Sequence, residues 1–390
     1  MACEQVTLQD VCELIVDCPH TSAKDEGVGY PLIRTPNVGR GRLILADVHR
    51  VSQDVYERRV SRAVPRQGDL ILAREAPAGN VAIVSPGIEV CLGQRTMLLR
   101  PDSSFVVPEY LNYYLNAPEQ RDRMLRLANG ATVSHINVAD IRNMPVQLPS
   151  RGEQSKVAEP LNVLDDKIDL NNRLNDYLEQ LVDGKFQELF GGLNFNATLS
   201  DVAEITMGQS PAGSSYNEEG AGIIFYQGRG EFGWRFPKRR LYTTEPKRLA
   251  CEGDVLMSVR APVGDLNVAF ENCCIGRGLA TIHSETPSFA LYLMRFLKPQ
   301  LEAYNGEGTV FGSINGKALK SLEVALPSHN EVMQFESFAA PIDALIRSNE
   351  NETRKLNNLR NYLLPKLMSG EIDVSKVDLT QLTNNHLTDC

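Results

Sequence analysis

The sequence predicts an α+β protein in which two tandem domains with curled mixed sheets are separated by two long antiparallel helices that form a coiled coil. Two observations predict this class: strand-and-turn patterns alternate with long helical periodicities, and each feature occurs twice in the same order. We expect a first domain at 1–150, a central helix at 151–190, a second domain at 191–328, a C-terminal helix at 329–372 and a flexible tail at 373–390.

An internal duplication indicates two domains. Four groups of motifs recur in the same order in both halves of the chain, which chance does not produce. A repeat unit of this length indicates two domains rather than a solenoid of short repeats. The recurring groups are TLQDV at 7–11 with TLSDV at 198–202, GDLIL at 68–72 with GDVLM at 253–257, APAG at 76–79 with APVG at 261–264, and IN with LPS within 136–150 and within 314–328.

Within each repeat the pattern is mostly strand and turn. A short helix follows the strands, and a glycine-rich loop at 129–132 or 306–309 then leads to a second short helix and an extended exit. This order indicates an α+β domain with a curled sheet. The expected strands of the first repeat lie at 69–74, 81–85 and 96–100, and the expected helices that follow the strands lie at 108–115 and 287–297.

The two long helical segments match each other position by position. Their apolar residues recur at alternating steps of four and three, the spacing of a helix that packs along another helix. Both columns are apolar at the start, polar in the middle and apolar near the end. Antiparallel pairing about the column centres places Asn171 opposite Thr353 and Asn175 opposite Asn349, and we expect these polar pairs to fix the register.

Proline near the start of each helical segment affects the expected helix bounds. Pro160 and Pro341 are compatible only with a first turn or a break in a helix. We therefore expect a short lead-in before each helix, with continuous helix from about 160 to 190 and from about 341 to 367.

Composition indicates a globular chain, with 42% hydrophobic and 23% charged residues. No run of eighteen apolar residues exists, and the N-terminus lacks the pattern of a signal peptide, so we expect a cytoplasmic protein with no membrane contact. The eight cysteines form no C-x-x-C pair, and the spacing of His20 from Cys12 and Cys18 does not suit tetrahedral zinc. We expect no metal site.

The net charge of −9 is unevenly distributed. Each domain is close to neutral, at −1, while the two helical segments with the tail together carry −7. All bases of the first domain except Lys24 are arginines, whose planar fork suits guanine and phosphate. The charge therefore does not exclude nucleic acid as a partner of the domains, and the acidic helices are expected to bind protein.

The sequence lacks the motifs of several catalytic classes. The segment Gly312–Ala318 is one residue short of a phosphate-binding loop and lacks its hydroxyl, and no dinucleotide fingerprint, amino-methyltransferase motif or nucleophile elbow occurs. Glu245-Pro246-Lys247 supplies only the tail of a common nuclease motif. The sequence indicates a non-catalytic protein.

The motifs in their paired order resemble the DNA-specificity subunit of type I restriction–modification systems. The resemblance covers about residues 5–373, and rests on the repeated TLxDV, GD[LV] and APxG motifs, the glycine-rich loop leading to IN, the LP before Glu153, LDDKI at 164–168 and LPKLMSGEI at 364–372. It implies that the two domains are target-recognition domains, each reading one half of a bipartite site in double-stranded DNA, and that the helices set the spacer. It also implies two methyltransferase subunits and motor–nuclease restriction subunits as partners. S-adenosylmethionine, ATP and Mg are then expected on those partners, and no cofactor on this chain.

Candidate DNA-binding residues follow from the polar loops, which differ between the two repeats on one frame. In the first domain they are Ser22, Lys24, Arg34, Asn37, Arg40, Arg42, Arg74, Arg95, His135 and Asn137. In the second domain they are Gln209, Ser210, Gln227, Arg229, Trp234, Arg235, Arg260, Arg277, Ser313, Asn315 and Lys317. Each arginine can instead be a solvated surface charge, and Asn137 and Asn315 can instead be turn residues.

Two alternatives remain open from the residues. A duplicated scaffold that binds protein or sugar fits the acidic total charge, and a self-contained DNA methyltransferase or nuclease fits less well because its motifs are missing. The dependence of binding on salt distinguishes a DNA binder from the scaffold, because counterions are released from the phosphates.

Overall fold

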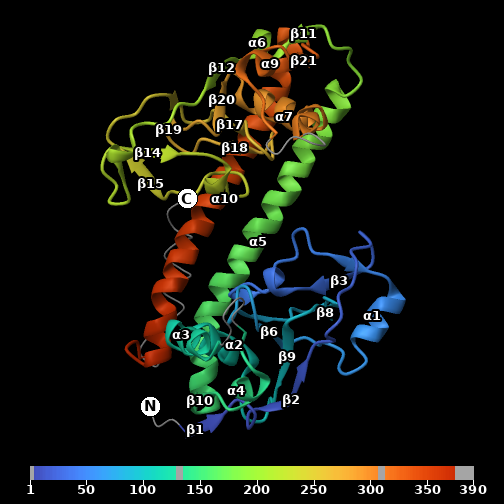
Figure 1. Cartoon of the computed structure of the whole chain (residues 1–390), viewed down its shortest axis with the longest axis vertical. Coiled ribbons are helices and arrows are strands. Elements are labelled where there is room, and N and C mark those ends of the chain that lie inside the picture. The colour runs from blue at the N-terminus through green and yellow to red at the C-terminus, as the bar shows by residue number, and fades with distance from the viewer. Residues whose placement is uncertain (1–3, 129–134, 306–311, 374–390) are drawn as a thin grey trace. The chain divides into compact units, whose positions relative to one another are not determined.

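A computed structural model describes residues 4–128, 135–305 and 312–373 (Figure 1). The chain forms two compact units: unit 1 comprises Met1–Leu170 and Thr353–Cys390, and unit 2 comprises Asn171–Glu352. Each unit contains one globular domain, part of helix α5 and part of helix α10. The expected tail, apart from its first residue, and both glycine-rich loops lie outside the described residues.

The domain of unit 1 is built on a five-stranded mixed sheet in the order β2-β9-β6-β7-β4, with a three-stranded sheet β5-β3-β8 and the pair β1-β10 beside it. The pairs β4–β7 and β3–β8 are parallel and the others antiparallel. The strands are β1 Glu4–Thr7, β2 Cys12–Asp17, β3 Tyr30–Ile33, β4 Gly41–Arg42, β5 Arg50–Val51, β6 Leu70–Ala73, β7 Val81–Ile83, β8 Cys91–Leu92, β9 Thr96–Pro101 and β10 Pro145–Leu148. The helices are α1 Gln53–Arg59, α2 Pro108–Asn116, α3 Pro118–Leu127 and α4 Val138–Arg142.

The domain of unit 2 contains a four-stranded sheet β12-β20-β17-β18, a five-stranded sheet β13-β15-β14-β19-β16 and the pair β11-β21. The strands are β11 Ala197–Thr198, β12 Glu204–Met207, β13 Tyr216–Asn217, β14 Ile223–Tyr226, β15 Leu241–Thr243, β16 Leu249–Ala250, β17 Val255–Ser258, β18 Leu266–Val268, β19 Cys273–Ile275, β20 Leu279–His283 and β21 Glu323–Val324. The helices are α6 Leu199–Val202, α7 Pro287–Phe296, α8 Lys298–Glu302 and α9 Gly316–Lys320.

The repeated sequence motifs occupy the same places in both units. Each GD motif directly precedes a central buried strand, β6 or β17. The following ladders also correspond, because Leu70 pairs with Leu99 in unit 1 and Val255 with Ile282 in unit 2. Both Ala-Pro bonds of the APxG motifs are cis. The predicted α+β class with two tandem domains and mixed sheets is confirmed.

Helix α5 spans Arg151–Phe190 and helix α10 spans His329–Ser369, so both begin earlier than predicted. Pro160 and Pro341 lie inside the helices rather than at their first turns. The expectation of a separate lead-in was therefore wrong.

A pair of capping boxes explains the early helix starts. The Ser150 hydroxyl donates to the Glu153 carboxylate at 2.7 Å, and that carboxylate also accepts from the Ser150 backbone N–H at 3.0 Å. Ser328 and Glu331 make the same contacts at 2.7 and 2.9 Å. Such boxes satisfy backbone groups at a helix start. The free energy gained by burying residues beside each proline, such as Leu161, offsets the cost of the hydrogen bond that the proline removes.

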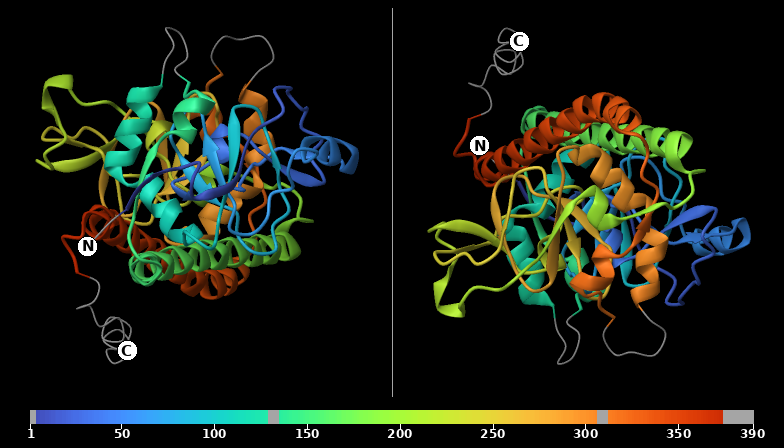
Figure 2. Two further views of the ribbon diagram at one scale, coloured as in Figure 1. Left: turned by 90° about the horizontal axis from the view of Figure 1, so that it is seen from below. Right: turned by 90° about the horizontal axis from the view of Figure 1, so that it is seen from above.

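The segments of α5 and α10 run antiparallel within each unit, where the two views of Figure 2 show them side by side in green and red. In unit 2 the Asn349 amide donates to the Asn175 side chain at 2.8 Å, and the rings of Phe186 and Phe335 lie 5.3 Å apart. In unit 1 the Arg360 guanidinium contacts Asp165 at 2.6 Å. In both units, higher residue numbers on α5 meet lower numbers on α10.

Both helices contribute to the cores of the domains. Val157, Leu161 and Leu367 belong to the core of unit 1. The core of unit 2 takes Phe186 and Phe190, where the column predicted from the sequence continued to Lys185 and Leu189. The buried face shifts by one residue there because the end of α5 packs on the domain rather than along α10 alone. No helix in the described ranges is long and apolar enough to cross a membrane.

Candidate nucleic-acid interface

One edge of the unit 1 domain gathers loops that are far apart in the sequence. The loop after β2, the turn after β3 and the turn before β9 meet there, and Gln94 donates to the His20 carbonyl at 3.1 Å. Two clefts of about 280 and 210 Å³ both include Gln94 and Arg95 in their linings. Ser22 and Arg34 line the smaller cleft, and Arg74 lines the larger. We call this surface edge 1.

Arg95 has an unusual backbone at edge 1. Its φ of 66° lies in the left-handed region, which costs free energy for a residue with a side chain. The guanidinium is 55% exposed and contacts the Glu75 carboxylate at 2.8 Å. The surrounding loops hold Arg95 in this conformation, so its side chain is presented to solvent from a fixed backbone.

Arg74 and Asn37 serve within the domain instead of pointing outward. Arg74 binds the Asp17 carboxylate at 2.7 Å and the Ile136 carbonyl at 2.9 Å. The buried Asn37 side chain accepts from the Arg34 N–H at 3.2 Å and donates to a backbone carbonyl at 3.1 Å. These side chains shape the loops that carry the exposed residues, and neither is free to contact a base.

Three further candidates lie on neighbouring parts of unit 1. His135 forms a backbone bridge with Glu75, which connects it to edge 1. Asn137 precedes α4 and donates to Asp140 at 3.1 Å, as expected of a turn residue. Lys24 lies exposed in the same loop as Ser22, after β2.

The same edge of the unit 2 domain carries a different set of polar side chains. The Ser210 hydroxyl accepts from the Arg277 N–H at 3.2 Å, and the Gln209 backbone N–H donates to the Ile275 carbonyl at 3.0 Å. The Gln227 carbonyl accepts from the N–H of Gly278 at 3.2 Å. Arg260 and Ser313 are joined by the bridge that corresponds to Glu75 and His135. We call this surface edge 2.

Basic residues line a cleft of unit 2 that has a volume of about 740 Å³. Lys317 lies there with Arg248 and Lys320, two residues that the sequence analysis missed. Asn315 caps α9 by accepting from the Ala318 N–H at 3.0 Å, so its side chain is used as a turn residue.

The remaining candidates lie toward the long helices. Arg235 is 4% exposed and binds Asp343 of α10 and Glu179 of α5, both at 3.0 Å. Burial alone would lower the pKa of Arg235, but Tyr292 and the two carboxylates outweigh it and raise that pKa above its usual range. In unit 1, Arg42 binds Asp166 of α5 at 2.6 Å. These arginines hold domain to helix, so their predicted role in reading bases is not supported by their positions.

Trp234 and Arg229 also have partners outside the residues of edge 2. Trp234 lies beside Asp176 of α5, where its hydrogen bond partly offsets the rise in pKa that burial gives that carboxyl. Arg229 forms an ion pair with Asp265. In unit 1, Arg40 is exposed on the loop just before Arg42.

A description of the family follows from comparison with known proteins. The family model for the type I restriction modification DNA specificity domain matches the chain twice, over residues 2–180 and 196–361. The chain belongs to this family. The resemblance seen in the sequence is thereby confirmed. Each match covers the domain of one repeat and most of the helix that follows it.

Relatives of the DNA specificity family match over nearly the whole chain. The putative type I restriction enzyme MjaX specificity subunit of Methanocaldococcus jannaschii is 31% identical, over 94% of this chain and 93% of that protein. The MjaIX specificity subunit of the same organism is 22% identical, over 85% and 84%. The crystal structure of the type I restriction–modification S subunit from M. genitalium has the same fold, with a TM-score of 0.60 at 15% identity over 94% of this chain and 96% of that one.

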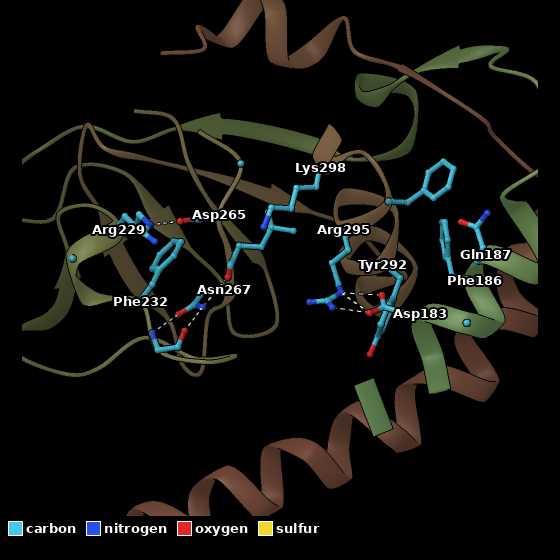
Figure 3. A pocket seen from close by; sticks show the side chains of 16 residues that line it. Asp183, Phe186, Gln187, Arg229, Phe232, Asp265, Asn267, Tyr292, Arg295 and Lys298 are labelled. Carbon is cyan, nitrogen blue, oxygen red and sulfur yellow. Dashed lines mark hydrogen bonds and ion pairs between the residues drawn. The ribbon is translucent and has the colours of Figure 1, made fainter. Parts of the chain in front are cut away.

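A groove of about 880 Å³ in unit 2 lies between α5 and loops of the domain (Figure 3). Asp183 and Gln187 of α5 lie on one side of it, and Arg229 and Asp265 on the other. Most of its charges are paired within the groove, since Arg229 binds Asp265 and Arg295 binds Asp183. Among the described residues, the groove therefore does not offer a row of unpaired cations to phosphates.

Gln94 is the residue at edge 1 that the sequence analysis should have found. The segments CLGQR at 91–95 and CIGRG at 274–278 align, so Gln94 occupies the place of Arg277. The same alignment places Gly278 at the position of Arg95, where the backbone of unit 1 is left-handed. The pattern was visible in the sequence, but the two short segments lay outside the four repeated groups.

Proposed function

We propose that this chain is the DNA-specificity subunit of a type I restriction–modification complex. Each recognition domain reads one half of a bipartite site in double-stranded DNA, and the α5 and α10 pair sets the spacer between the halves. The chain carries out no catalysis. The observation that supports this most directly is that edges 1 and 2 carry different polar side chains on equivalent loops of one duplicated scaffold.

The partners proposed for the complex are two methyltransferase subunits and motor–nuclease restriction subunits, in the cytoplasm. S-adenosylmethionine, ATP and Mg are bound by those subunits. Docking on the helices is supported by exposed apolar residues at helical spacing on α5, namely Leu174, Tyr177 and Leu181. Two acidic residues of the helices, Asp343 and Glu179, instead hold the domain of unit 2.

The residues proposed to face DNA are exposed or partly exposed residues of the two edges and of the basic cleft of unit 2. Bidentate recognition of guanine by arginine is the commonest specific contact with DNA, so Arg95, Arg260 and Arg277 are the leading base-reading candidates. Contacts with phosphates are proposed for Lys317, Arg248 and Lys320. These basic side chains line one cleft, and no acidic residue is among the described residues that line it. The other proposed contacts are Ser22, Lys24, Arg34, Gln94, His135, Gln209, Ser210, Gln227 and Ser313.

The test compares Arg95→Ala with Arg277→Ala in the assembled methyltransferase. Each substitution is expected to relax recognition at one position of a different half-site, at a cost of about 1–3 kcal/mol in discrimination. Methylation of a library of randomised half-sites measures this. Arg58→Ala, on the exposed face of α1, is the matched control and should leave both halves unchanged.

Two results would contradict the proposal. If both substitutions affect the same half, the assignment of one domain to each half is wrong. If DNA binding by the complex does not weaken steeply with rising salt, the phosphate contacts are wrong, and the duplicated scaffold becomes the better description.

A further inference from the structure

Three side chains with metal-binding atoms converge in unit 2, away from edge 2. Cys251 and Asp254 lie on the turn between β16 and β17, and His283 is the last residue of β20. The Cys251 sulfur, an Asp254 carboxylate oxygen and a His283 ring nitrogen all lie within 4.8 Å of one another. Among the cysteines in the described ranges, Cys251 is the exposed one, so its thiol is open to solvent.

The aspartate of this cluster is held in place by its neighbours. One Asp254 oxygen accepts from the Cys251 backbone N–H at 2.8 Å and from the Thr281 hydroxyl at 2.9 Å. The other oxygen lies 2.6 Å from His283 Nδ1. Hydrogen bonds of this kind orient metal ligands in known sites, and mutation of such partners weakens metal binding. The carboxylate is thus fixed while the thiol and the imidazole can each adjust by rotation.

The duplicated domain shows what the same turn looks like without metal-binding side chains. In unit 1, Asp69 accepts from the Arg66 N–H at 2.9 Å, just as Asp254 does from Cys251. Arg100, at the strand position equivalent to His283, grips Asp69 with two hydrogen bonds of 2.9 and 2.7 Å. A permanent cation therefore neutralises the buried aspartate of unit 1.

Unit 2 has potential ligands where unit 1 has two arginines, and both units have the aspartate. Arg66 and Arg100 correspond to Cys251 and His283. A bound cation there would supply the positive charge that Arg100 supplies in unit 1. Thiolate, imidazole and carboxylate together suit zinc and cobalt better than magnesium or calcium, which prefer oxygen alone.

We propose that Cys251, Asp254 and His283 form a binding site for a single divalent transition-metal ion of the zinc type. Binding requires the thiol to lose its proton and the metal to replace the proton shared between His283 and Asp254, so protons are released to solvent. Three protein ligands leave one position of a tetrahedral ion open to water or to Glu204, which lies opposite His283 in the β12–β20 ladder.

The site lies at the far end of the β17–β20 ladder from edge 2. Val255 pairs with Ile282 next to the cluster, whereas Ser258 pairs with Leu279 near Arg260 and Arg277. A metal ion there links the turn before β17 to the end of β20. Its role is therefore to stabilise the frame of the domain, and it does not take part in base recognition.

The test uses the full chain without an affinity tag, freed of metal by a chelator and then titrated with Co²⁺. The expected result is a thiolate-to-cobalt charge-transfer band that saturates at one equivalent of Co²⁺. The band should disappear when Zn²⁺ is added and displaces the cobalt. Cys251→Ser should abolish the band, and His283→Gln should weaken binding by at least about tenfold. Both positions are exposed, so neither substitution should prevent folding.

Glu252→Gln is the matched control, because Glu252 lies in the same turn but binds Arg347 at 2.6 Å. It should leave the band unchanged. Absence of a band at saturating Co²⁺, or a band that survives Cys251→Ser, would overturn the proposal. A second measurement is thermal unfolding: Zn²⁺ should raise the unfolding temperature of the unsubstituted chain and leave that of Cys251→Ser unchanged.

Discussion

The junctions between domain and long helices in the two units share an aspartate and a tyrosine but take their arginine from different elements. In unit 1, Asp165 of α5 accepts from the Tyr113 hydroxyl at 2.7 Å and from Arg360 of α10 at 2.6 Å. Burial, and the charge of Asp165 beside it, raise the pKa of Tyr113, so the tyrosine remains a donor. The contact with the buried carboxylate joins helix to helix. The domain adds the tyrosine and a more exposed ion pair between Arg42 and Asp166 of α5.

In unit 2, Asp343 of α10 accepts from the Tyr292 hydroxyl and from Arg235, both at 3.0 Å. Arg235 belongs to the recognition domain, and it also binds Glu179 of α5 at 3.0 Å. Arg295 of the domain contacts the same Glu179 at 2.9 Å. Charge therefore connects this domain directly to both helices.

The difference indicates how the duplicated halves have diverged. A buried carboxylate requires a partner cation, because an unpaired charge in the interior is costly. Either element can supply the cation, and the choice determines whether the helices are bound to each other or the domain is bound to the helices. Four experiments would break or sharpen this comparison.

The largest effect is expected for Arg235→Ala. It leaves Asp343 and Glu179 without this shared partner in a nearly buried site, and breaking such a pair costs about 3–5 kcal/mol of unfolding free energy. Chemical denaturation followed by fluorescence measures it, since Trp234 is the single tryptophan of the chain. Arg239→Ala, which breaks an exposed pair with Glu271, should cost about 0–1 kcal/mol. Equal costs would show that the buried junction is not special.

Arg360→Ala should destabilise unit 1, and its rescue should differ from that of unit 2. Among the described residues, Asp165 is the carboxylate that Arg360 binds, so adding Asp165→Asn should recover most of the loss of about 2–4 kcal/mol. Adding Asp343→Asn to Arg235→Ala should recover less, because Glu179 still lacks Arg235. A double-mutant cycle of unfolding free energies measures both. Equal rescue in the two units would contradict the comparison.

A fragment of residues 1–190 should dimerise, because its α5 can take the place of the missing α10 of a second copy. In that dimer the helical column places Val182 where Arg360 stands in the full chain, so Asp165 loses its cation. Val182→Arg in the fragment should therefore tighten the dimer by at least about tenfold, or 1.4 kcal/mol. Sedimentation at several concentrations measures the dissociation constant.

The same fragment, in complex with the methyltransferase, is expected to direct methylation to a symmetric interrupted site with two copies of the first half-target. Val182→Ala is the control for Val182→Arg, since it changes the same position without adding a charge. A fragment that remains monomeric at high micromolar concentration, or that still recognises an asymmetric site, would refute the pairing.

The smallest effect is expected from the polar centre of the helix pair in unit 2. Asn175 and Asn349 are buried and bond each other at 2.8 Å. Replacing both by Leu should raise the unfolding free energy by about 1 kcal/mol while weakening the register, because apolar side chains tolerate a slip that buried amides do not. Disulfide trapping between cysteines introduced at alternative registers measures this. Replacing only one of them should destabilise the pair.

The sequence was sufficient to predict the architecture because several independent patterns indicate the same fold. A motif such as GDLIL carries little information alone, but its recurrence as GDVLM in the same order makes the duplication certain, and a matching column of apolar residues makes the helix pair specific. The bounds of the helices were less accessible. The predicted start relied on Pro160, whereas the Ser150–Glu153 capping box marks the true start.

The functional side chains were harder to place because loop arginines look alike in a sequence. Arg235 and Arg277 both stand in polar loops, yet one is buried against Asp343, more than a hundred residues later, and the other is exposed at edge 2. Only the fold shows which carboxylates meet which arginines. The cluster of Cys251, Asp254 and His283 was missed for the same reason, since its third member lies on a strand that is distant in the sequence.

The division of the chain into units has a consequence for its biosynthesis. Unit 1 is completed by residues from Thr353 onward, so the whole of unit 2 is translated between its two parts. At about 5–20 residues per second, the first domain waits roughly 10–40 s before Leu367 is available to its core. Unit 2, whose residues are contiguous, can fold first. During that interval the apolar face around Val157 and Leu161 lacks its C-terminal cover. It is then exposed to neighbouring nascent chains on the same messenger RNA.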